Sequence, residues 1–569
     1  MQRRCSSRFA TSPSGYGFAR VAPNGHRASL SSTLTPPTPA FPPANMFSCA
    51  PDNRLTGDVY YPTDPGYDAA RFQWNTSVTS NPCVVVYAKN EQDVSTAVLT
   101  AATWNLPLSL RCGRHDYIGN SGGSGMVLDV SKINYVEIDP IRDVAHLGAG
   151  CALGEVYYKL WQQGYCLNGG SCPSVGVAGH SAGGGVGVIG RKYGMIVDSM
   201  VAARAVLADG SVVSCSQSEL PDLFWALRGG GGGNYACSTE FTFNIFKIPE
   251  NSVDIFMVWD RWSEAFGCLK LWQNWMQSPA FKNDERMWCQ MNITPGKLTM
   301  VGHFHGGTVD EARALLAPLL RYGNIKGITG TVGPTFIART PATYFGSVAY
   351  WGGCTAPETP WGTENDAALC LQQIPQDQAL TMALPFKIKS GYTGPAPLSD
   401  EGIATIVYYL TPGVTPPQAD VPTGLLLDSY GGAVSRSVGG PTAFPHRDQI
   451  FGYQFLAYFQ PAAQAVTIAW QRAFFNAMIP FMNGNMYRNY CDTDIQHYNQ
   501  AYFGAALPYL IQVKTKYDPT NVFNGNIQGM PSMCDGSQPF HPECGGCTDA
   551  TKQPLRNSGC SLPRRIMPQ

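Results

Sequence analysis

Charge is scarce in this chain of 569 residues, and the two signs nearly cancel. Lysine and arginine total 39, aspartate and glutamate total 40, and charged residues make up 14% of the sequence; about a quarter is usual. The formal net charge is −1. A nucleic-acid-binding protein needs a basic face to neutralise phosphates, so the composition argues against that class.

Long hydrophobic runs are missing as well. No window approaches about 18 uninterrupted apolar residues, the length at which a run is read as a transmembrane helix, so we expect no membrane-spanning helix and no membrane partner. Glycine (61) and proline (43) are frequent. In a chain with 44% hydrophobic residues, this indicates many turns and close backbone approaches rather than disorder.

The first 51 residues contain no aspartate, glutamate or lysine. They contain several arginines among many serines, threonines and prolines, but lack the apolar stretch of a signal peptide. The segment therefore resembles an organelle transit peptide, or lies upstream of a true start at Met46. We interpret residues 1–52 as a disordered or targeting leader.

Cysteine is abundant, with 18 residues, which favours a disulfide-bonded exported protein over a cytosolic one. The sequons at Asn75 and Asn292 agree with export. We therefore predict secretion, with an organelle as the alternative location. The tail at 532–569 fits a disulfide-bonded segment better than a zinc knuckle, and we predict no metal site; its cysteines are Cys534, Cys544, Cys547 and Cys560.

The rest of the chain changes character along its length. After a lead-in at 53–77, residues 78–250 are rich in glycine and strand patterns, residues 251–484 are richer in tryptophan, methionine and long amphipathic stretches, and residues 485–531 are again dense in motifs. Alternating and β-branched runs predict strands at 84–87, 126–130 and 201–207. Helical spacing of apolar residues predicts helices at 91–105, 264–275 and 466–478.

Two glycine motifs are misleading. Residues 185–190 match GxGxxG, and Asp209 stands near the spacing of a ribose-binding acid. A dinucleotide fingerprint must lie between a strand and a helix, yet residues 191–194 carry no helical apolar stripe. The glycine run 229–233 is not a phosphate-binding P-loop, because no Gly-Lys-Ser/Thr follows it.

Four other segments combine glycine with reactive side chains: GRHDY (113–117), CPSVGVAGH (172–180), DLFWALRGGGGG (222–233), and NYCD (489–492) followed by KYDPTNVF (516–523). Consecutive backbone N–H groups in a glycine turn can bind a diphosphate, and glycine-rich backbone can lie flat against a planar ligand. Taken singly, His115 would be a polar loop residue and Cys172 one more half-cystine.

Together, these segments resemble the berberine-bridge-enzyme-like family, within the FAD-binding type shared by vanillyl-alcohol oxidase and p-cresol methylhydroxylase (PCMH). The resemblance runs from about residue 52 to 531. It implies an α+β fold with three parts. A PCMH-type FAD-binding domain of two subdomains (78–250) precedes a substrate domain on an antiparallel sheet covered by helices (251–484), and a berberine-bridge-like C-terminal segment (485–531) returns to the FAD domain.

The resemblance also implies a covalently bound FAD. His115 would attach to the 8α-methyl group and Cys172 to C6 of the isoalloxazine ring, while His180 would stabilise negative charge near the N1–C2=O edge. A doubly attached flavin has a high reduction potential and is not lost from an open site. The expected cofactor-binding residues are Arg111, Gly113, Arg114, His115, Asp116, Cys172, Val175, Gly176, Gly179, His180, Asn234, Asn489 and Tyr490.

Tyr490 matches the family's active-site tyrosine. A phenol with a pKa near 10 is a poor base at neutral pH, so it needs a cation or hydrogen bonds that lower its pKa. Gln454 falls where alkaloid-cyclising members place a glutamate base, and glutamine cannot accept a proton. This favours an alcohol or sugar oxidase over an enzyme that closes carbon–carbon rings. Tyr117 is a plausible neighbour in the pocket.

The expected function is an FAD-dependent oxidase with Tyr490, Gln454, Tyr117 and His180 as catalytic residues. Hydride would pass from an alcohol carbon to flavin N5, and dioxygen would then be reduced to hydrogen peroxide. Val175 matches the position where oxygen-reactive members carry valine and oxygen-excluding members leucine. The alternatives are a flavin dehydrogenase with another acceptor, or a non-catalytic flavin-binding secreted protein.

Two substrate classes remain open: an oligosaccharide oxidised at its anomeric carbon, and a small aromatic or allylic alcohol. Sugar faces need aromatic platforms, which tryptophans of the middle region could provide, although we expect most of them to belong to the core: Trp259, Trp262, Trp272, Trp275, Trp288 and Trp351. We expect a monomer.

Overall fold

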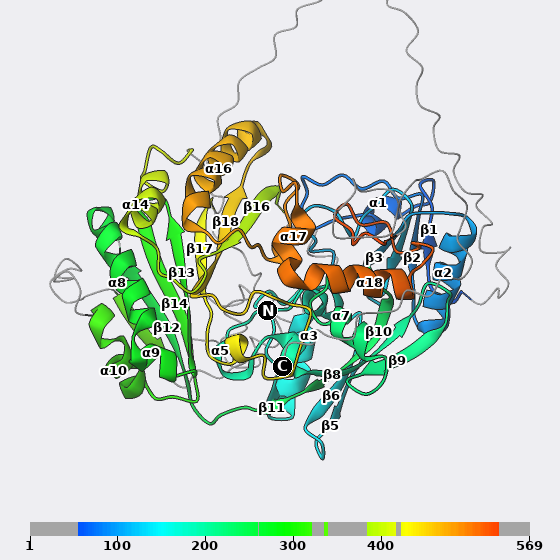
Figure 1. Cartoon of the computed structure of the whole chain (residues 1–569), viewed down its shortest axis with the longest axis horizontal. Helices are drawn as coiled ribbons and strands as arrows, with labels where there is room; N and C mark the ends of the chain where they lie inside the picture. Colours follow the sequence, from blue (N-terminus) through cyan, green and yellow to red (C-terminus); the bar gives the residue numbers. More distant parts are fainter. Residues whose placement is uncertain (1–54, 260, 321–334, 340–383, 417–422, 534–569) are drawn as a thin grey trace, which may run out of the picture. The chain divides into compact units, whose positions relative to one another are not determined.

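The computed structural model describes residues 55–259, 261–320, 335–339, 384–416 and 423–533. The predicted leader at 1–52, nearly all of the tail at 532–569, and Trp351 lie outside these residues. The predicted strands and helices are confirmed, with ends that shift by two residues at most (Figure 1). Among the described helices, none is long and apolar enough to span a bilayer.

The first sheet supports the GRHDY segment. Its spatial order is β1 (Val59–Tyr60), β2 (Val84–Tyr87), β4 (Met126–Asp129) and β3 (Leu108–Arg111), with β2 and β3 parallel to β4 between them. All of β2 and β4 is buried, as expected for parallel strands covered on both faces. Because β3 ends at Arg111, the next residues leave the sheet at the carboxyl edge of a parallel strand, a common place for ligand sites.

The second sheet is antiparallel. Its order is β5 (Val136–Asp139), β6 (Val144–Gly148), β10 (Cys237–Asn244), β8 (Met200–Val206) and β9 (Val212–Ser216). Helix α2 (Glu91–Thr103) contacts both β4 and β8, so it lies between the two sheets. Its N-terminus is capped by Asn90, whose side chain accepts from the Asp93 N–H at 2.9 Å.

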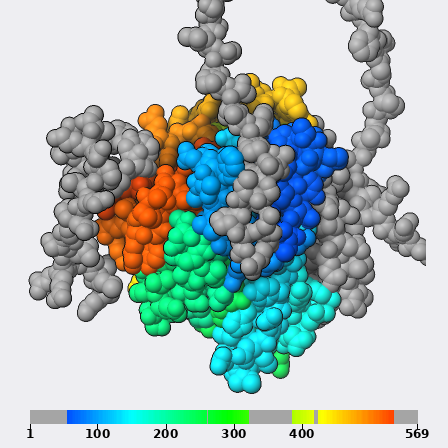
Figure 2. Space-filling model, turned by 90° about the vertical axis from the view of Figure 1, so that its right-hand side faces the viewer, coloured from blue at the N-terminus to red at the C-terminus, as the bar shows by residue number. Residues whose placement is uncertain are grey.

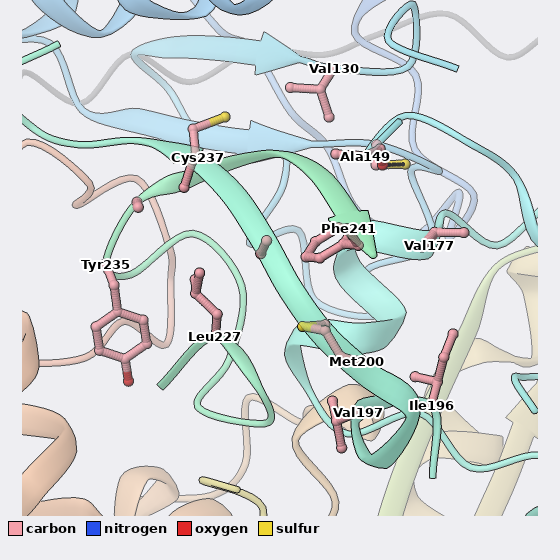
Figure 3. Packing of buried hydrophobic residues seen from close by; sticks show 14 of the residues in the cluster. Val130, Ala149, Val177, Ile196, Val197, Met200, Leu227, Tyr235, Cys237 and Phe241 are labelled. Atoms are coloured by element: carbon pink, nitrogen blue, oxygen red, sulfur yellow. Dashed lines mark hydrogen bonds between the residues drawn. The ribbon is translucent and has the colours of Figure 1, made fainter. Parts of the chain in front are cut away.

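A hydrophobic core joins the second sheet to the motif loops. Figure 3 shows Phe241 of β10 beside Met200 of β8, with Ile196 and Val197 of α6 (Ile196–Ser199) close to Met200 and Cys237 at the other end of β10. Nearby short elements include α3 (Leu153–Gln162), α4 (Val177–Ala182), α5 (Gly190–Tyr193) and the pair β7 (Tyr165–Cys166) and β11 (Phe246–Lys247). The misleading GxGxxG motif opens α5, which is only four residues long.

The sheet in the region predicted as a substrate domain, 251–484, is named the substrate-domain sheet after that prediction. It is antiparallel and has seven strands among the described residues. Their order is β15 (Thr335–Arg339), β12 (Ser252–Trp259), β14 (Lys297–His305), β13 (Met287–Thr294), β17 (Thr423–Ser429), β18 (Phe451–Tyr458) and β16 (Phe386–Tyr392). Helices lie on one side of this sheet (Figure 1): α8 (Ala265–Gln277), α9 (Pro279–Asn283), α10 (Val309–Leu320), α14 (Asp400–Tyr409) and α16 (Gln464–Met478). Their apolar residues and those of the strands form one core.

The C-terminal segment returns to the FAD-binding part. A single 3₁₀ turn, Arg488–Tyr490, precedes α17 (Tyr498–Phe503) and α18 (Leu507–Tyr517), and α18 packs against α7 (Pro221–Leu227). Asp222 of α7 accepts from Lys516 at 2.6 Å and from the Tyr517 hydroxyl at 2.7 Å. In Figure 2 the orange C-terminal segment accordingly borders green residues of the FAD-binding part.

Two features suggested export: the cysteine count and the sequons. The structure of the described residues supports neither of them. All ten described cysteines are free, so the expected disulfides are not found among them. Asn75 is only 2% exposed and its amide is fully hydrogen-bonded, which leaves no room for a glycan. Asn292 lies inside β13, a strand paired on both sides. Secretion stays a prediction without these two supports.

Candidate functional site

One cavity of about 420 Å³ brings the four motif segments together. Every expected cofactor-binding residue lines it, and so does Tyr117. Gln454 is not among the lining residues but donates a hydrogen bond from Nε2 to the Tyr117 hydroxyl at 2.8 Å. The volume is in the range of small-molecule and cofactor sites.

The cavity floor is built where two glycine loops meet. A Cβ atom on Gly113 would lie 2.3 Å from the backbone nitrogen of Gly176, and one on Gly176 would lie 2.2 Å from Sγ of Cys112. Glycine is therefore required at both positions to bring the loops this close. At Gly179, by contrast, no atom lies within 4 Å of a Cβ position, so the backbone there is open to a planar ligand.

The charged side chains of the first loop maintain its shape. Arg111 is buried and its Nε donates to Asp129 at 2.5 Å. Arg114 has a left-handed φ of 63° and donates to the Tyr87 hydroxyl at 2.7 Å. Asp116 accepts from three consecutive backbone N–H groups at 2.7–3.0 Å. These contacts fix the turn from which His115 projects.

His115 is held from two sides. Its ring stacks on Trp74, with centroids 4.4 Å apart and an interplanar angle of 27°, and its Nε2 lies 2.9 Å from Oγ of Ser174. Burial lowers the pKa of His115 to about 4, so the imidazole is neutral at neutral pH. A neutral imidazole keeps one nitrogen with a free lone pair, as a nucleophile requires.

Cys172 is the only exposed residue among the ten described cysteines; Cys83 is half-buried and the other eight are buried. It lines the same cavity as His115. A free thiol is normally among the most buried side chains. This exception therefore marks Cys172 as the cysteine available for reaction with a molecule in the cavity.

His180 and two asparagines tie the other segments together. Nε2 of His180 accepts from the Gly170 N–H at 2.8 Å, which leaves the ring proton on Nδ1 as a donor; burial lowers the pKa of His180 to about 4. Asn489 donates to the His180 carbonyl at 2.9 Å. Asn234 donates to the Gly231 carbonyl at 3.1 Å and accepts from Asn526 at 3.1 Å.

Aromatic side chains form the opposite wall. The rings of Tyr117 and Tyr490 stack, with centroids 5.6 Å apart and an angle of 6°, and Phe386 meets Tyr117 edge-on at 5.2 Å. Phe386 and Tyr458 begin β16 and end β18, and both line the cavity. The substrate-domain sheet thus faces the motif loops through aromatic rings.

Buried ion pairs hold the Tyr490 segment against β16. Asp492 pairs with Lys387 at 2.5 Å and with Lys389, and Asp494 pairs with Lys389 at 2.7 Å. The Ser390 hydroxyl accepts from the Tyr487 N–H at 3.0 Å. These bonds fix the short turn that carries Tyr490 relative to the substrate-domain sheet.

The electrostatics of Tyr490 differ from the expectation of a lowered pKa. Burial raises its pKa well above 10, and Asp428 and Tyr117 act in the same direction. Burial likewise raises the pKa of Asp428, to about 6, although its carboxylate accepts from Gln290 at 2.5 Å. Asp428 and Tyr490 both line a small cavity of about 10 Å³, close to the least volume that holds one water.

Sequence reasoning missed several of these residues. Trp74, Phe386 and Asp428 lie in no motif, and only tertiary contacts bring them to the site. Most of the tryptophans of the middle region belong to the core, as expected: Trp259, Trp272, Trp275 and Trp288 are at most 5% exposed. In the described residues no cluster of His, Cys, Asp or Glu is arranged to hold a metal ion.

Comparisons with known proteins agree with this arrangement. The family described as "FAD binding domain" matches residues 82–216, and the family "Berberine and berberine like" matches residues 486–529. An uncharacterized FAD-linked oxidoreductase of Bacillus subtilis, YgaK, is 31% identical over 83% of this chain and 96% of its own length. Berberine bridge enzyme-like 21 of Arabidopsis thaliana is 29% identical over 85% of this chain and 90% of its own.

Solved structures give the same result. Physcomitrella patens BBE-like 1 superposes with a TM-score of 0.74 at 25% identity, over 86% of this chain and 98% of that one. Glucooligosaccharide oxidase from Acremonium strictum, whose structure is described as containing 6-S-cysteinyl, 8α-N1-histidyl FAD, superposes with a TM-score of 0.69 at 25% identity, over 84% and 97%. A PCMH-type α+β fold, an FAD-binding domain and a relative more than 30% identical over most of both chains lead to one conclusion: this chain belongs to the berberine-bridge-enzyme-like family of FAD-linked oxidoreductases.

Proposed function

We propose that this protein is an oxidase that removes a hydride from an alcohol carbon, with FAD attached through both His115 and Cys172. The observation that carries the proposal is that one cavity is lined by a neutral imidazole, the one exposed thiol among the described cysteines, and the Tyr490 phenol. The glycine-lined floor and the open backbone at Gly179 fit a planar ring. Glucooligosaccharide oxidase, a neighbour in fold, carries its FAD on a histidine and a cysteine by its own description.

Bound FAD would accept the hydride at N5 and pass two electrons to dioxygen, giving hydrogen peroxide. The chain's own task is to position the substrate and move its hydroxyl proton. The Tyr490 phenol lines the cavity, within reach of a bound alcohol. His180 offers an N–H donor to the negative charge that develops on reduction.

Asp428 supplies the negative charge that the proton transfer requires. A phenol with a raised pKa cannot accept a proton unless its own proton leaves at the same time. The carboxyl of Asp428, with a pKa of about 6, is ionised at neutral pH and shares a small cavity with the phenol. Tyr490 therefore takes the substrate proton as it passes its own toward Asp428.

The wall opposite the loops favours a carbohydrate over a small aromatic alcohol. Nε2 of Gln454 donates to the Tyr117 hydroxyl oxygen at 2.8 Å. The hydroxyl proton of Tyr117 is not used in this hydrogen bond, so it can be donated to a substrate oxygen. Phe386 and Tyr458 add aromatic faces beside it. A row of ring faces with a polar donor matches the alternating apolar and hydroxyl surfaces of a sugar.

A substrate panel tests this function. Glucose, xylose and N-acetylglucosamine oligosaccharides and a set of benzylic and allylic alcohols are added under anaerobic conditions, and the visible flavin spectrum is followed. Bleaching by a sugar, with peroxide formed when air is admitted, supports the proposal. Bleaching that only a quinone reverses indicates a dehydrogenase, and a flavin that no compound bleaches indicates a non-catalytic flavin-binding protein.

A further inference from the structure

Two side chains hold the His115 ring, and the family resemblance assigned no role to either of them. Trp74 stacks on one face of the imidazole, with ring centroids 4.4 Å apart, and the main-chain N–H of Trp74 donates to the Arg114 carbonyl at 3.0 Å. Ser174 contacts the ring edge through Oγ, 2.9 Å from Nε2. The stack fixes the plane of the ring, and the hydrogen bond fixes its rotation within that plane.

These contacts distinguish the two ring nitrogens. Nε2 is engaged by Ser174, so Nδ1 is the nitrogen left for other chemistry. If the hydroxyl of Ser174 accepts from Nε2–H, the lone pair is on Nδ1, because a neutral imidazole carries one proton. Both His115 and Ser174 line the cavity in which the flavin would lie.

We propose that Ser174 and Trp74 are positioning residues for flavin attachment: Ser174 holds the His115 tautomer with its lone pair on Nδ1, and Trp74 holds the ring so that Nδ1 reaches the 8α-methyl group. The inference rests on the proposed covalent attachment at His115. It makes attachment at His115 dependent on the loop that carries Cys172, because Ser174 stands two residues after that cysteine.

The step is a two-electron oxidation. The new Nδ1–C8α bond replaces one hydrogen of the methyl group and the N–H hydrogen of the imidazole, and both leave as protons. The two electrons pass through the ring system to dioxygen, which is reduced to hydrogen peroxide with two protons. A hydroxyl suits this exchange, since it accepts from Nε2–H before the bond forms and donates to bare Nε2 afterwards.

The experiment compares attachment at the two anchors. The full chain is produced under riboflavin limitation and incubated with FAD in air; samples are quenched with acid and digested, and flavin on the His115 and Cys172 peptides is quantified by mass spectrometry. In Ser174→Ala we expect the rate of attachment at His115 to fall about five- to tenfold, the effect of one lost hydrogen bond, with attachment at Cys172 unchanged. Ser174→Thr should restore the rate, and Trp74→Leu should lower it.

Attachment at Cys172 serves as the internal control for folding. Ser121→Ala is the matched control, because Ser121 lines the same cavity but donates to Gln73 at 3.1 Å and not to His115. Equal rates at His115 in Ser174→Ala and the wild type would overturn the inference. Absence of flavin on the His115 peptide of the wild type would instead overturn the proposed attachment itself.

Discussion

The side chain of Asn75 pairs with the main chain of Phe386 as a neighbouring strand would. Its Oδ1 accepts from the Phe386 N–H at 3.1 Å, and its Nδ2 donates to the Phe386 carbonyl at 3.1 Å. The same Nδ2 donates to the Tyr117 carbonyl at 2.8 Å. One buried amide thus ties the first residue of the substrate-domain strand β16 to the loop that carries His115 and Tyr117.

The first prediction concerns this amide. Asn75→Ala should lower the free energy of unfolding by about 1–3 kcal/mol, because it leaves buried main-chain groups of Phe386 without partners. Substrate reduction of the flavin should slow as well, since Phe386 packs on Tyr117. Denaturant unfolding and stopped-flow reduction measure the two effects. Asn81→Ala, at an exposed asparagine nearby, should change the free energy of unfolding by no more than about 0.5 kcal/mol. Equal effects of the two substitutions would contradict a stabilising role for the contacts between Asn75 and Phe386.

The second prediction concerns the two anchors. Acid-precipitated wild-type protein should remain yellow, because flavin bound through a covalent bond stays with the denatured chain. His115→Ala and Cys172→Ala should each keep part of the covalent flavin, and only the double variant should release all of it. Absorbance of pellet and supernatant measures the outcome, and a yellow wild-type supernatant would refute the assignment.

The third prediction concerns the phenol of Tyr490. Tyr490→Phe keeps the ring that stacks on Tyr117, so the fold and the flavin spectrum should barely change. Loss of the group that accepts the substrate proton should slow flavin reduction by about 10²–10⁴-fold, measured by anaerobic stopped flow. Tyr458→Phe, at another cavity tyrosine, is the control. A Tyr490→Phe protein that is reduced at the normal rate would assign the proton transfer to another group.

The fourth prediction concerns pH. Because the pKa of Asp428 is raised to about 6, its carboxyl is protonated below that pH and ionised above it, so the rate of flavin reduction should fall as pH decreases through about 6. In Asp428→Asn, flavin reduction should be slow at every pH, and its rate should not show this fall at low pH. Gln290→Leu removes the hydrogen bond that favours the ionised form of Asp428, so the rate should begin to fall at a higher pH. An unchanged profile in both variants would exclude Asp428 from the proton transfer.

Local patterns in the sequence were enough to predict several strands and helices, and the family resemblance predicted one side of the site. The strands at 84–87 and 126–130 and the helix at 91–105 follow from β-branched runs and apolar spacing, and the structure contains β2, β4 and α2 there. The motif residues share a backbone framework of glycine turns, so their grouping around one cavity was predictable from the family resemblance.

The other side of the site depends on contacts between distant parts of the chain. Trp74 reaches His115, and Asn75 reaches Phe386, only when the loops and the substrate-domain sheet are assembled. The raised pKa values of Tyr490 and Asp428 come from burial, which no local pattern reports. Sequon and cysteine counts likewise carry no information on burial, and Asn75 and most described cysteines are buried.

The last prediction concerns dioxygen and Val175. The Val175 side chain is half-buried and lines the cavity. Its main-chain N–H donates to the Cys172 carbonyl at 3.2 Å, and its carbonyl accepts from the Leu153 N–H at 2.9 Å. The main chain is thus fixed, and a longer side chain would extend into the cavity beside the proposed Cys172 anchor. Leucine adds one methylene, which would fill space that dioxygen needs to approach the reduced ring.

Val175→Leu should therefore leave substrate reduction of the flavin nearly intact, slow reoxidation by dioxygen strongly, and still permit reoxidation by a quinone. Stopped flow measures the two half-reactions separately. Val175→Ile adds the same methylene but keeps the branched Cβ, so it serves as the matched variant and tests whether shape or volume matters. If Val175 only packs the loop, the leucine would damage both half-reactions together or neither, and an unaltered oxygen rate in a folded Val175→Leu protein would remove the case for a gate at this position.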